Sequence, residues 1–308
     1  MMTTINQFRD ELKKEVGFLM PAYEMRDAEI VKFNDRKLVG FTAVRPGEFG
    51  GPTIWANDFM PAAEHGISVR EMAQHITTSF LAIPNDIEEL RKMTAEGSLP
   101  DMAFEKIRPR IRARIADKAL NAEFLADKPY RELEAGFALF ASVDLGDPSK
   151  GHGFCTITNG LAKDEGYDEG RLFDAAIENV KPHMLPLHAA LFSTETGRAM
   201  PNLLDDPSLY DKEDKTFLLT NEDSFLGAAA LFAPEIKERI FDMMGSYYVL
   251  PSSIHEVLLL PEDDCDEPAA LIRMIGEANA SVVADEDILS NRLLLFDGKE
   301  LKEVTCNV

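Results

Sequence analysis

The chain has 308 residues, of which 45% are hydrophobic and 28% charged, so it is long enough for two domains with packed cores. Its 54 acidic and 32 basic residues give a net charge of −22, which argues against direct binding to nucleic acid or to an anionic membrane. No stretch approaches the roughly 20 apolar residues that span a bilayer, and the amphipathic first residues lack a signal-peptide pattern, so we expect a cytoplasmic protein.

Metal and cofactor motifs are missing from the sequence. The cysteines Cys155, Cys265 and Cys306 are odd in number and far apart, which argues against a disulfide framework and a structural zinc site. His183 and His188 are five positions apart, with a proline between them, a poor spacing for a helical metal pair. No GxGxxG or phosphate-loop motif occurs. We therefore predict no metal ion and no cofactor.

The first third of the chain predicts an α+β module. Hydrophobic residues at helical spacing indicate a helix over residues 4–16. Strands are expected at 29–33 and 38–45, with a turn at Asn34-Asp35, and at 52–55. Ser68 and Glu71 form a capping box for a helix to about Leu81, and a further helix follows Asn85. The segment 96–100 predicts a boundary between modules 1–97 and 98–308.

A long helix is predicted to begin near Met102, because Ile107, Ile111 and Ile115 lie on one stripe. Basic side chains surround this stripe at every second position, and on a helix that spacing distributes them over both flanks. They either bind phosphate or an acidic partner surface, or pair with the chain's own carboxylates. The candidate binding residues are Arg108, Arg110, Arg112 and Arg114.

The rest of the chain alternates strands and helices. Strands are predicted at 137–143, 153–158, 217–220 and 247–260, helices at 168–180, 227–244 and 268–280, a loop at 193–215, and a final hairpin over 288–296 turning at Asp297-Gly298. Strands that end in Asn57, Asn159 and Asn221 precede helices, which indicates either tandem modules or convergent turn chemistry. The predicted fold is α+β, with mixed, largely antiparallel sheets packed against helices.

The segment 247–261, YYVLPSSIHEVLLLP, is the main chemical candidate. A hydrolase would use Ser252 or Ser253 as nucleophile, His255 as base and Glu256 as an orienting group. Ser253 and His255 share one face of a strand, whereas Glu256 faces the other way, which counts against its role. The structural alternative is that Pro251 ends the ladder, the serines satisfy freed backbone groups, and the histidine is hydrogen-bonded in the interior. A zinc-protease motif is excluded because Leu259 occupies the second histidine position.

Several motifs resemble those of an uncharacterised bacterial family of unknown function. They are PTIWANDF, ITNGLAKDEGYDEGRLFDAAIENV, LLTNEDSFLGAAALFAPEIKERI, PSSIHEVLLLP and EANASVVADEDILSNRLLLFDG, which span nearly the whole chain. Trp55 stands where a tyrosine is expected. The resemblance implies one family unit without assigned chemistry, of a kind often encoded on mobile elements of gut bacteria.

Two functions remain as hypotheses. The first is a non-enzymatic interaction protein that binds a protein partner, a nucleic-acid-handling or defence protein, through its acidic surface. Its acidic residues cluster at 205–206, 211–214, 262–267 and 285–287, although such clusters are more often solvated loops and helix starts that aid solubility. The second is the hydrolase centred on Ser253 and His255. The sequence does not indicate an oligomeric state.

Overall fold

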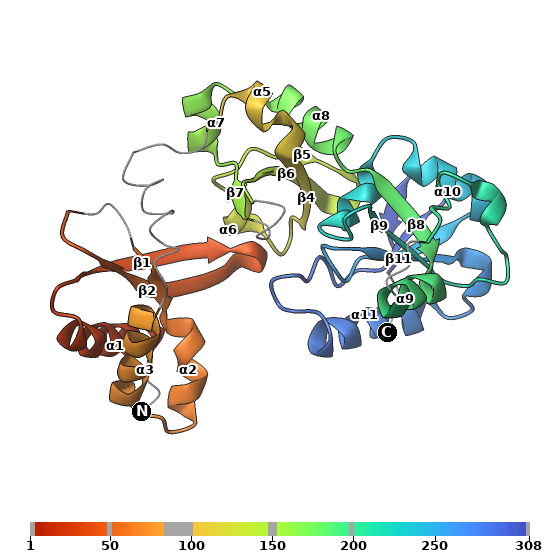
Figure 1. Cartoon of the computed structure of the whole chain (residues 1–308). Helices are drawn as coiled ribbons and strands as arrows, with labels where there is room; N and C mark the ends of the chain where they lie inside the picture. Colours follow the sequence, from red (N-terminus) through yellow and green to blue (C-terminus); the bar gives the residue numbers. More distant parts are fainter. Residues whose placement is uncertain (1–3, 48–50, 83–100, 147–152, 197–199, 306–308) are drawn as a thin grey trace. The chain divides into compact units, whose positions relative to one another are not determined.

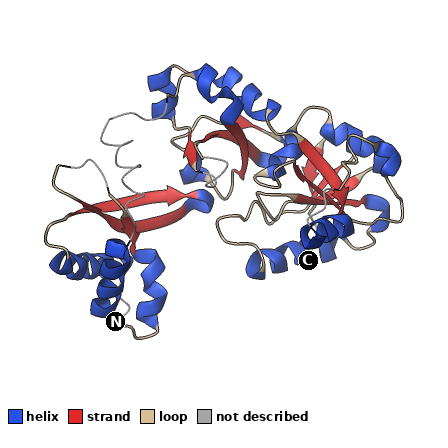
Figure 2. Cartoon of the chain, in the orientation of Figure 1, coloured by secondary structure: helices blue, strands red, loops and turns tan. Residues whose placement is uncertain are grey.

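The structure is a computed structural model that describes residues 4–47, 51–82, 101–146, 153–196 and 200–305. It confirms an α+β fold in which the strand pairs of the described residues are all antiparallel (Figures 1 and 2). The chain forms two compact units, Met1–Met102 and Ala103–Val308, and each is described by itself. The predicted helix after Asn85 and the predicted boundary at 96–100 lie outside the described residues.

The N-terminal unit is a three-stranded sheet with helices on one side (Figure 1). Its strands, in sheet order, are β1 (Glu24–Lys32), β2 (Arg36–Val44) and β3 (Thr53–Trp55). Its helices are α1 (Ile5–Leu19), α2 (Ala56–Glu64) and α3 (Val69–Ala82). A 3₁₀ turn, Phe33–Asp35, joins β1 to β2 at the predicted position.

Helical spacing and caps explain the N-terminal helices. Phe8, Leu12 and Val16 form the buried stripe of α1 and pack into the core with Phe41 of β2. The predicted capping box of α3 is present: the Glu71 backbone N–H donates to Ser68 Oγ (3.3 Å), and the Ser68 backbone N–H donates to the Glu71 carboxylate (3.0 Å). The sequence pattern therefore accounts for the buried face of α1 and for the start of α3.

The C-terminal unit contains two sheets. In the first, β4 (Ile111–Asp117) and β5 (Arg131–Glu132) flank β6 (Phe137–Asp144), which also pairs with β7 (Phe154–Thr156). The second has six strands in the order β13-β12-β10-β11-β9-β8. These are β8 (Pro182–Pro186), β9 (Phe217–Asn221), β10 (Tyr247–Leu250), β11 (Val257–Pro261), β12 (Leu294–Phe296) and β13 (Leu301–Glu303).

Seven α-helices are described in this unit. They are α5 (Phe104–Ile107), α6 (Ala122–Leu125), α7 (Asn159–Glu165), α8 (Glu169–Glu178), α9 (Leu187–Thr196), α10 (Ile236–Met244) and α11 (Pro268–Ser281). The predicted helices at 168–180 and 268–280 correspond to α8 and α11. The final hairpin, β12 and β13, turns at Asp297-Gly298, whose carboxylate accepts hydrogen bonds from the backbone N–H groups of Lys299 and Glu300 (3.1 and 3.2 Å).

Three predicted elements outside the segment 247–261 are wrong. The long helix after Met102 is instead α5, a 3₁₀ turn and β4, because the alternation of isoleucine, alanine and arginine from Ile111 has the period of a strand. The predicted helix 227–244 divides into a 3₁₀ helix, Gly227–Phe232, and α10, separated at Pro234, whose ring cannot continue a helix. The predicted loop 193–215 contains the end of α9 and a 3₁₀ turn, Pro207–Leu209.

The three strand-end asparagines have different roles. Asn57 lies inside α2, and its side chain accepts from the Val39 backbone N–H (2.8 Å). Asn159 is the first residue of α7. Asn221 ends β9, and its side chain accepts from the Phe225 backbone N–H (3.1 Å) to close a turn. The shared pattern thus corresponds to three unlike local structures.

A buried ion pair connects the two sheets of the C-terminal unit. Asp117, at the end of β4, is 2% exposed, and its carboxylate lies 2.9 Å from Arg292 Nη2 and accepts from Arg292 Nε (3.0 Å). The Ser290 hydroxyl donates to the same carboxylate (2.7 Å), while Arg292 Nη1 donates to the Ala135 carbonyl (2.7 Å). Since Ser290 and Arg292 lead into β12, this pair holds the six-stranded sheet against β4.

Replacement of Asp117 with asparagine should destabilise the protein by about 2–3 kcal/mol, because the partly buried guanidinium of Arg292 would lose the nearer of its two counter-charges and keep only Glu303 (3.3 Å). The measurement is the free energy of unfolding in urea. The matched control is Asp174→Asn, whose exposed carboxylate pairs with Arg131 (2.8 Å) and should matter by less than about 1 kcal/mol. Equal effects of the two substitutions would contradict the structural role given to Asp117.

Candidate functional site

The segment 247–261 is a β-hairpin. Strands β10 and β11 pair antiparallel, with Tyr247 opposite Pro261 and Leu250 opposite Leu258. The prediction of one strand over 247–260 is therefore wrong, and Pro251 begins the connecting loop 251–256. Both strands lie inside the six-stranded sheet, which explains their continuous apolar sequence. The four candidate catalytic residues thus belong to a loop, where strand alternation does not govern their direction.

The segment 287–290 holds this loop by main-chain hydrogen bonds. The Ile254 backbone N–H donates to the Asp287 carbonyl (2.9 Å). In return, the Leu289 backbone N–H donates to the Ser252 carbonyl (3.0 Å), and the Ser290 backbone N–H donates to the Pro251 carbonyl (2.9 Å). The loop is consequently fixed to the segment that carries Arg292.

The Ser253 side chain makes a hydrogen bond within the loop 251–256. Its side chain is buried, and its Oγ accepts a hydrogen bond from the His255 backbone N–H (3.0 Å). A serine nucleophile must instead present its hydroxyl to a base and to solvent. Ser252 and Glu256 are partly buried, and the described contacts include no hydrogen bond between Glu256 and His255. The structural interpretation of the serine pair accounts for the Ser253 contact.

Both ring nitrogens of His255 face protein groups. The Leu226 backbone N–H donates to Nδ1 (3.2 Å), so this atom holds a lone pair, and the proton of the neutral ring lies on Nε2. Nε2 in turn lies 3.4 Å from the Asp287 carboxylate. The ring also packs against Phe225, with centroids 4.9 Å apart. No lone pair of the neutral ring therefore remains for a substrate proton.

The turn 224–227 is shaped to meet the loop. Ser224 and Leu226 adopt positive φ angles of 51° and 57°, a conformation that costs of order 1 kcal/mol for residues with a side chain. It aims the backbone N–H groups of Leu226 and Gly227 at His255, whose carbonyl accepts from the Gly227 N–H (2.9 Å) and from the Thr220 hydroxyl (2.9 Å). Hydrogen bonds from this turn and from Thr220 therefore hold both the ring and the backbone carbonyl of His255 in place.

The arginine run lies on the 3₁₀ turn 108–110 and on strand β4, not on an α-helix. Arg108 and Arg110 belong to the 3₁₀ turn, and Arg108 pairs with Glu178 of α8 (3.0 Å). Arg112 and Arg114 point to one face of β4, because side chains alternate along a strand. The predicted scatter of these cations over two helix flanks is thus wrong, and the correction places two of them together.

Arg114 connects the arginine run to the loop 251–256. Burial lowers the pKa of Arg114 to about 10, and the nearby Asp287 carboxylate acts against that lowering. Its guanidinium lies over the ring of Phe140, 5.4 Å from the centroid. Because Asp287 also faces His255, the two sets of candidate residues, far apart in sequence, meet at one carboxylate.

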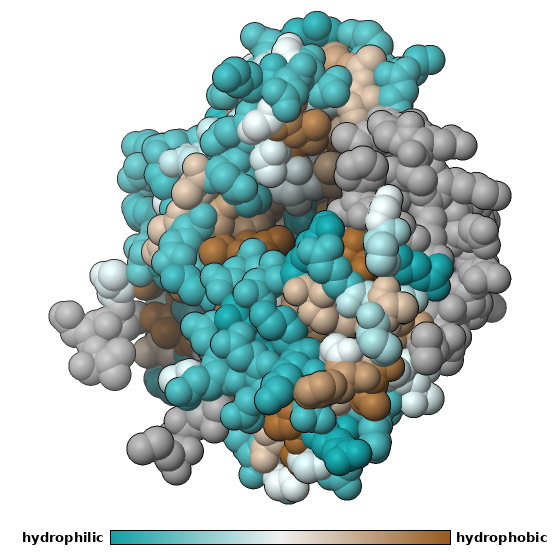
Figure 3. All heavy atoms as spheres, turned by 90° about the vertical axis from the view of Figure 1, so that its left-hand side faces the viewer, coloured by the Kyte–Doolittle hydropathy of each residue, from teal (hydrophilic) through white to brown (hydrophobic). Residues whose placement is uncertain are grey.

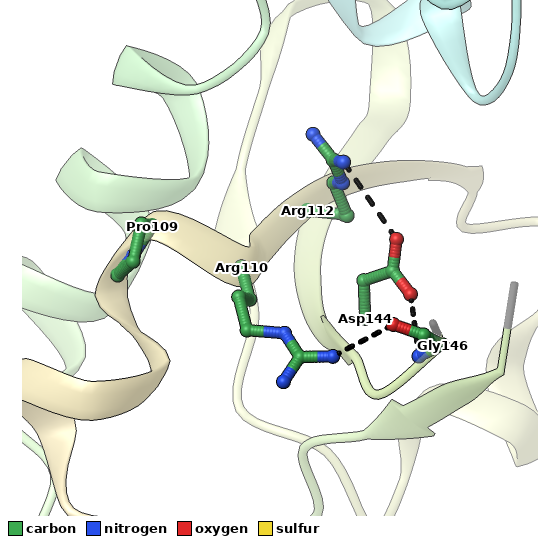
Figure 4. A pocket seen from close by; sticks show the side chains of 5 residues that line it. All are labelled: Pro109, Arg110, Arg112, Asp144 and Gly146. Carbon is green, nitrogen blue, oxygen red and sulfur yellow. Dashed lines mark hydrogen bonds and ion pairs between the residues drawn. The ribbon is translucent and has the colours of Figure 1, made fainter. Parts of the chain in front are cut away.

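A pocket of about 310 Å³ opens beside the start of β4 (Figure 4). It is lined by Pro109, Arg110, Arg112, Asp144 and Gly146. Arg110 Nη2 donates to the Gly146 carbonyl (3.0 Å), and Arg112 lies 3.6 Å from the Asp144 carboxylate. That carboxylate also accepts from the Gly146 backbone N–H (2.9 Å). The pocket therefore combines two cations with one carboxylate.

Sequence reasoning missed the carboxylates that organise this region. Asp144 ends a buried strand, and Asp223 lies 3.6 Å from Arg112 Nη1. Asp287 stands in the acidic cluster 285–287, which was interpreted as solvated. The sequence offered one signal for these carboxylates. Asp144 directly follows the apolar run 137–143, and an acidic residue at the end of a buried strand lies at the edge of the sheet, where functional side chains often occur. Within the described ranges, no group of three His, Cys, Asp or Glu could hold a metal ion.

Comparison with known proteins gives one match. The model of a family described as "Family of unknown function (DUF5688)" covers residues 4–298. No curated protein and no solved structure matches the chain. Among the helices of the described ranges, none has the length and apolar character needed to cross a membrane.

Replacement of Gly227 with alanine should destabilise the protein by about 3 kcal/mol, because its Cβ would lie 2.2 Å from Thr220 Oγ1 and 2.7 Å from the His255 carbonyl oxygen. The unfolding midpoint in urea measures the effect. The matched control is Gly276→Ala in exposed helix α11, where a Cβ meets nothing within 4 Å and should stabilise by about 0.5–1 kcal/mol. Unchanged stability of Gly227→Ala would refute the close packing of turn and loop.

Proposed function

Because the chain belongs to the DUF5688 family, whose function is unknown, we propose its role from the molecule itself: it is a non-enzymatic, cytoplasmic interaction protein that binds a protein partner through acidic surface. The partner class that fits is a basic, nucleic-acid-handling or defence protein, since proteins that hold phosphate backbones present lysine and arginine. A source on a bacterial mobile element belongs to the same proposal. The net charge of −22 provides the long-range attraction.

The convergence of two acidic segments carries the proposal. Segments 205–214 and 262–267 are about fifty residues apart in sequence, yet Lys215 Nζ lies 2.8 Å from the Asp264 carboxylate. Burial raises the pKa of Tyr210, as do the charges of Asp264, Asp214 and Asp211, while Lys215 lowers it, so carboxylates of both segments lie within electrostatic range of one tyrosine. The side chains of Asp263 and Asp266 are exposed beside them. Several acids grouped around an aromatic side chain suit a basic partner.

A hydrophilic exterior agrees with a role in recognition. On the face of the molecule seen in Figure 3, hydrophilic residues predominate, and hydrophobic residues occur in smaller groups. Electrostatic attraction at such a surface accelerates encounter and weakens as salt screens it.

The hydrolase alternative rests on the Asp287–His255 pair, which resembles the orienting pair of a catalytic triad. The hydrogen bond from the Leu226 N–H to the other ring nitrogen weighs against it, because that nitrogen would have to accept the serine proton.

The interaction proposal predicts that neutralising the acidic patch abolishes capture of a partner from native lysate at low salt. The patch variant carries Glu213→Gln, Asp263→Asn and Asp266→Asn, and the matched control carries Glu165→Gln, Asp164→Asn and Asp242→Asn at exposed sites elsewhere in the unit. The captured partner should bind the wild type and the control equally, and about 0.5 M salt should release it. Equal capture by both triple variants would refute the proposed surface.

The hydrolase alternative is tested with an activated ester. We expect the wild-type protein, Ser253→Ala and His255→Gln all to hydrolyse p-nitrophenyl acetate at the rate of buffer. A rate above buffer that Ser253→Ala removes would establish the enzyme instead, provided that the variant unfolds in urea like the wild type.

A further inference from the structure

The pocket at the start of β4 has the chemistry of a small-anion site. We propose that it binds a compact oxyanion of the phosphate type, held by the guanidinium groups of Arg110 and Arg112. This inference is independent of the protein partner proposed above, because it concerns a different surface and a different ligand. Its support comes from strand geometry, unfilled hydrogen-bond donors and local charge.

Strand pairing places the relevant groups on one face. In the antiparallel pair of β4 and β6, Arg112 lies opposite Ser142, and Arg114 lies opposite Phe140. Directly opposed residues point to the same side of a sheet. Asp144 is two residues beyond Ser142 on β6, so it shares that side, and Figure 4 shows its carboxylate directed toward Arg112. Arg112 and Asp144 therefore share the face beside the pocket, and Arg110 of the preceding 3₁₀ turn completes its charged lining.

The arginines have hydrogen-bond donors to spare. A guanidinium offers five N–H donors. Arg112 meets the carboxylates of Asp144 and Asp223 only at 3.6 Å each, beyond the length of a good hydrogen bond. Among the described residues, Arg110 donates one hydrogen bond, to the Gly146 carbonyl. A tetrahedral oxyanion supplies acceptors that such planar donors can hold in pairs.

A buried hydroxyl lies opposite Arg112, behind the residues that line the pocket. Ser142 is fully buried, and its Oγ has no hydrogen-bond partner among the described residues. Unpartnered buried hydroxyls are uncommon, and each calls for an explanation such as a bound ligand or water. The position of Ser142, opposite Arg112 on the same face, associates this unfilled group with the arginine.

Local charge and size restrict the ligand class. Arg110 and Arg112 contribute two positive charges, and Asp144, only 10% exposed, offsets one of them. The more exposed Asp223 is a competitor for Arg112. A site so balanced, in a chain of net charge −22, accepts one small anion and repels a polyanion such as nucleic acid. The volume of about 310 Å³ also suits a small molecule.

An aromatic neighbour allows the anion to carry a flat group. Phe154 lies opposite Asp144 in the pairing of β6 with β7, and its ring stacks on Phe225 with centroids 5.6 Å apart. Inorganic phosphate and a phosphomonoester with a planar ring, such as a nucleoside monophosphate, share the anchoring chemistry. The titration below separates these two sources.

The test is calorimetric titration of the full chain with inorganic phosphate and with adenosine monophosphate, at constant ionic strength set by sodium chloride. We expect saturable binding of phosphate, with tighter binding of the nucleotide if the rings contribute. Arg112→Gln should weaken phosphate binding about tenfold or more, since it removes charge-assisted hydrogen bonds. Arg108→Gln loses the same charge outside the pocket and should bind as the wild type does.

A variant that is expected to bind phosphate more tightly provides a test that a misfolded protein could not pass. Asp223→Asn removes the competing carboxylate without altering the pocket lining, so phosphate should bind more tightly. Unfolding midpoints in urea confirm that each variant is folded. The proposal is overturned if phosphate gives no more heat than chloride, or if Arg108→Gln weakens binding as much as Arg112→Gln. It is also overturned if Asp223→Asn fails to tighten binding.

Discussion

The buried pair of Asp117 and Arg292 is the constraint on which the C-terminal unit depends. A guanidinium above the ring of Phe137 and a carboxylate 2% exposed are tolerable in an interior only as hydrogen-bonded partners. Their contact determines where the segment 287–292 lies. That segment then holds the loop 251–256 and places Asp287 beside both His255 and Arg114. One ion pair thereby sets the surroundings of every candidate residue discussed above except the outer arginines.

Local signals predicted the elements that local chemistry controls. The capping box at Ser68, the turn at Asn34 and the helix start at Asp168 were visible because each depends on residues within one turn. The hairpin at 247–261 was missed because two apolar strands of a central sheet resemble one run, and the turn residues Pro251, Ser252 and Ser253 were interpreted as a break within a single strand. Its loop is held by distant residues, such as Asp287 and Leu226, that no local pattern reveals.

The arginine run shows how the choice between a helical and a strand period changes the predicted positions of the side chains. Isoleucines four residues apart fit a helix, but the same residues with the alanine between them also fit a strand of period two. On the helix the cations diverge, and on the strand Arg112 and Arg114 converge. The pocket could be found only after that choice was made, since its remaining groups, Asp144 and Gly146, come from another strand and its loop. The arginines were thus recognisable as candidates from the sequence, whereas the pocket that two of them form with Asp144 and Gly146 was not.

The hydrogen bonds of Arg292 and Ser290 to Asp117 cross 175 and 173 residues of sequence. Contacts this remote form late, because the entropy of closing so large a loop must be overcome first. During synthesis, β4 and β6 have left the ribosome long before their partner segment exists. The loop 251–256, which hydrogen-bonds to residues 287–290, consequently reaches its final geometry only when that late segment has docked. Residues 287–292 act as the closing element of the unit, so substitutions there would also alter the loop 251–256.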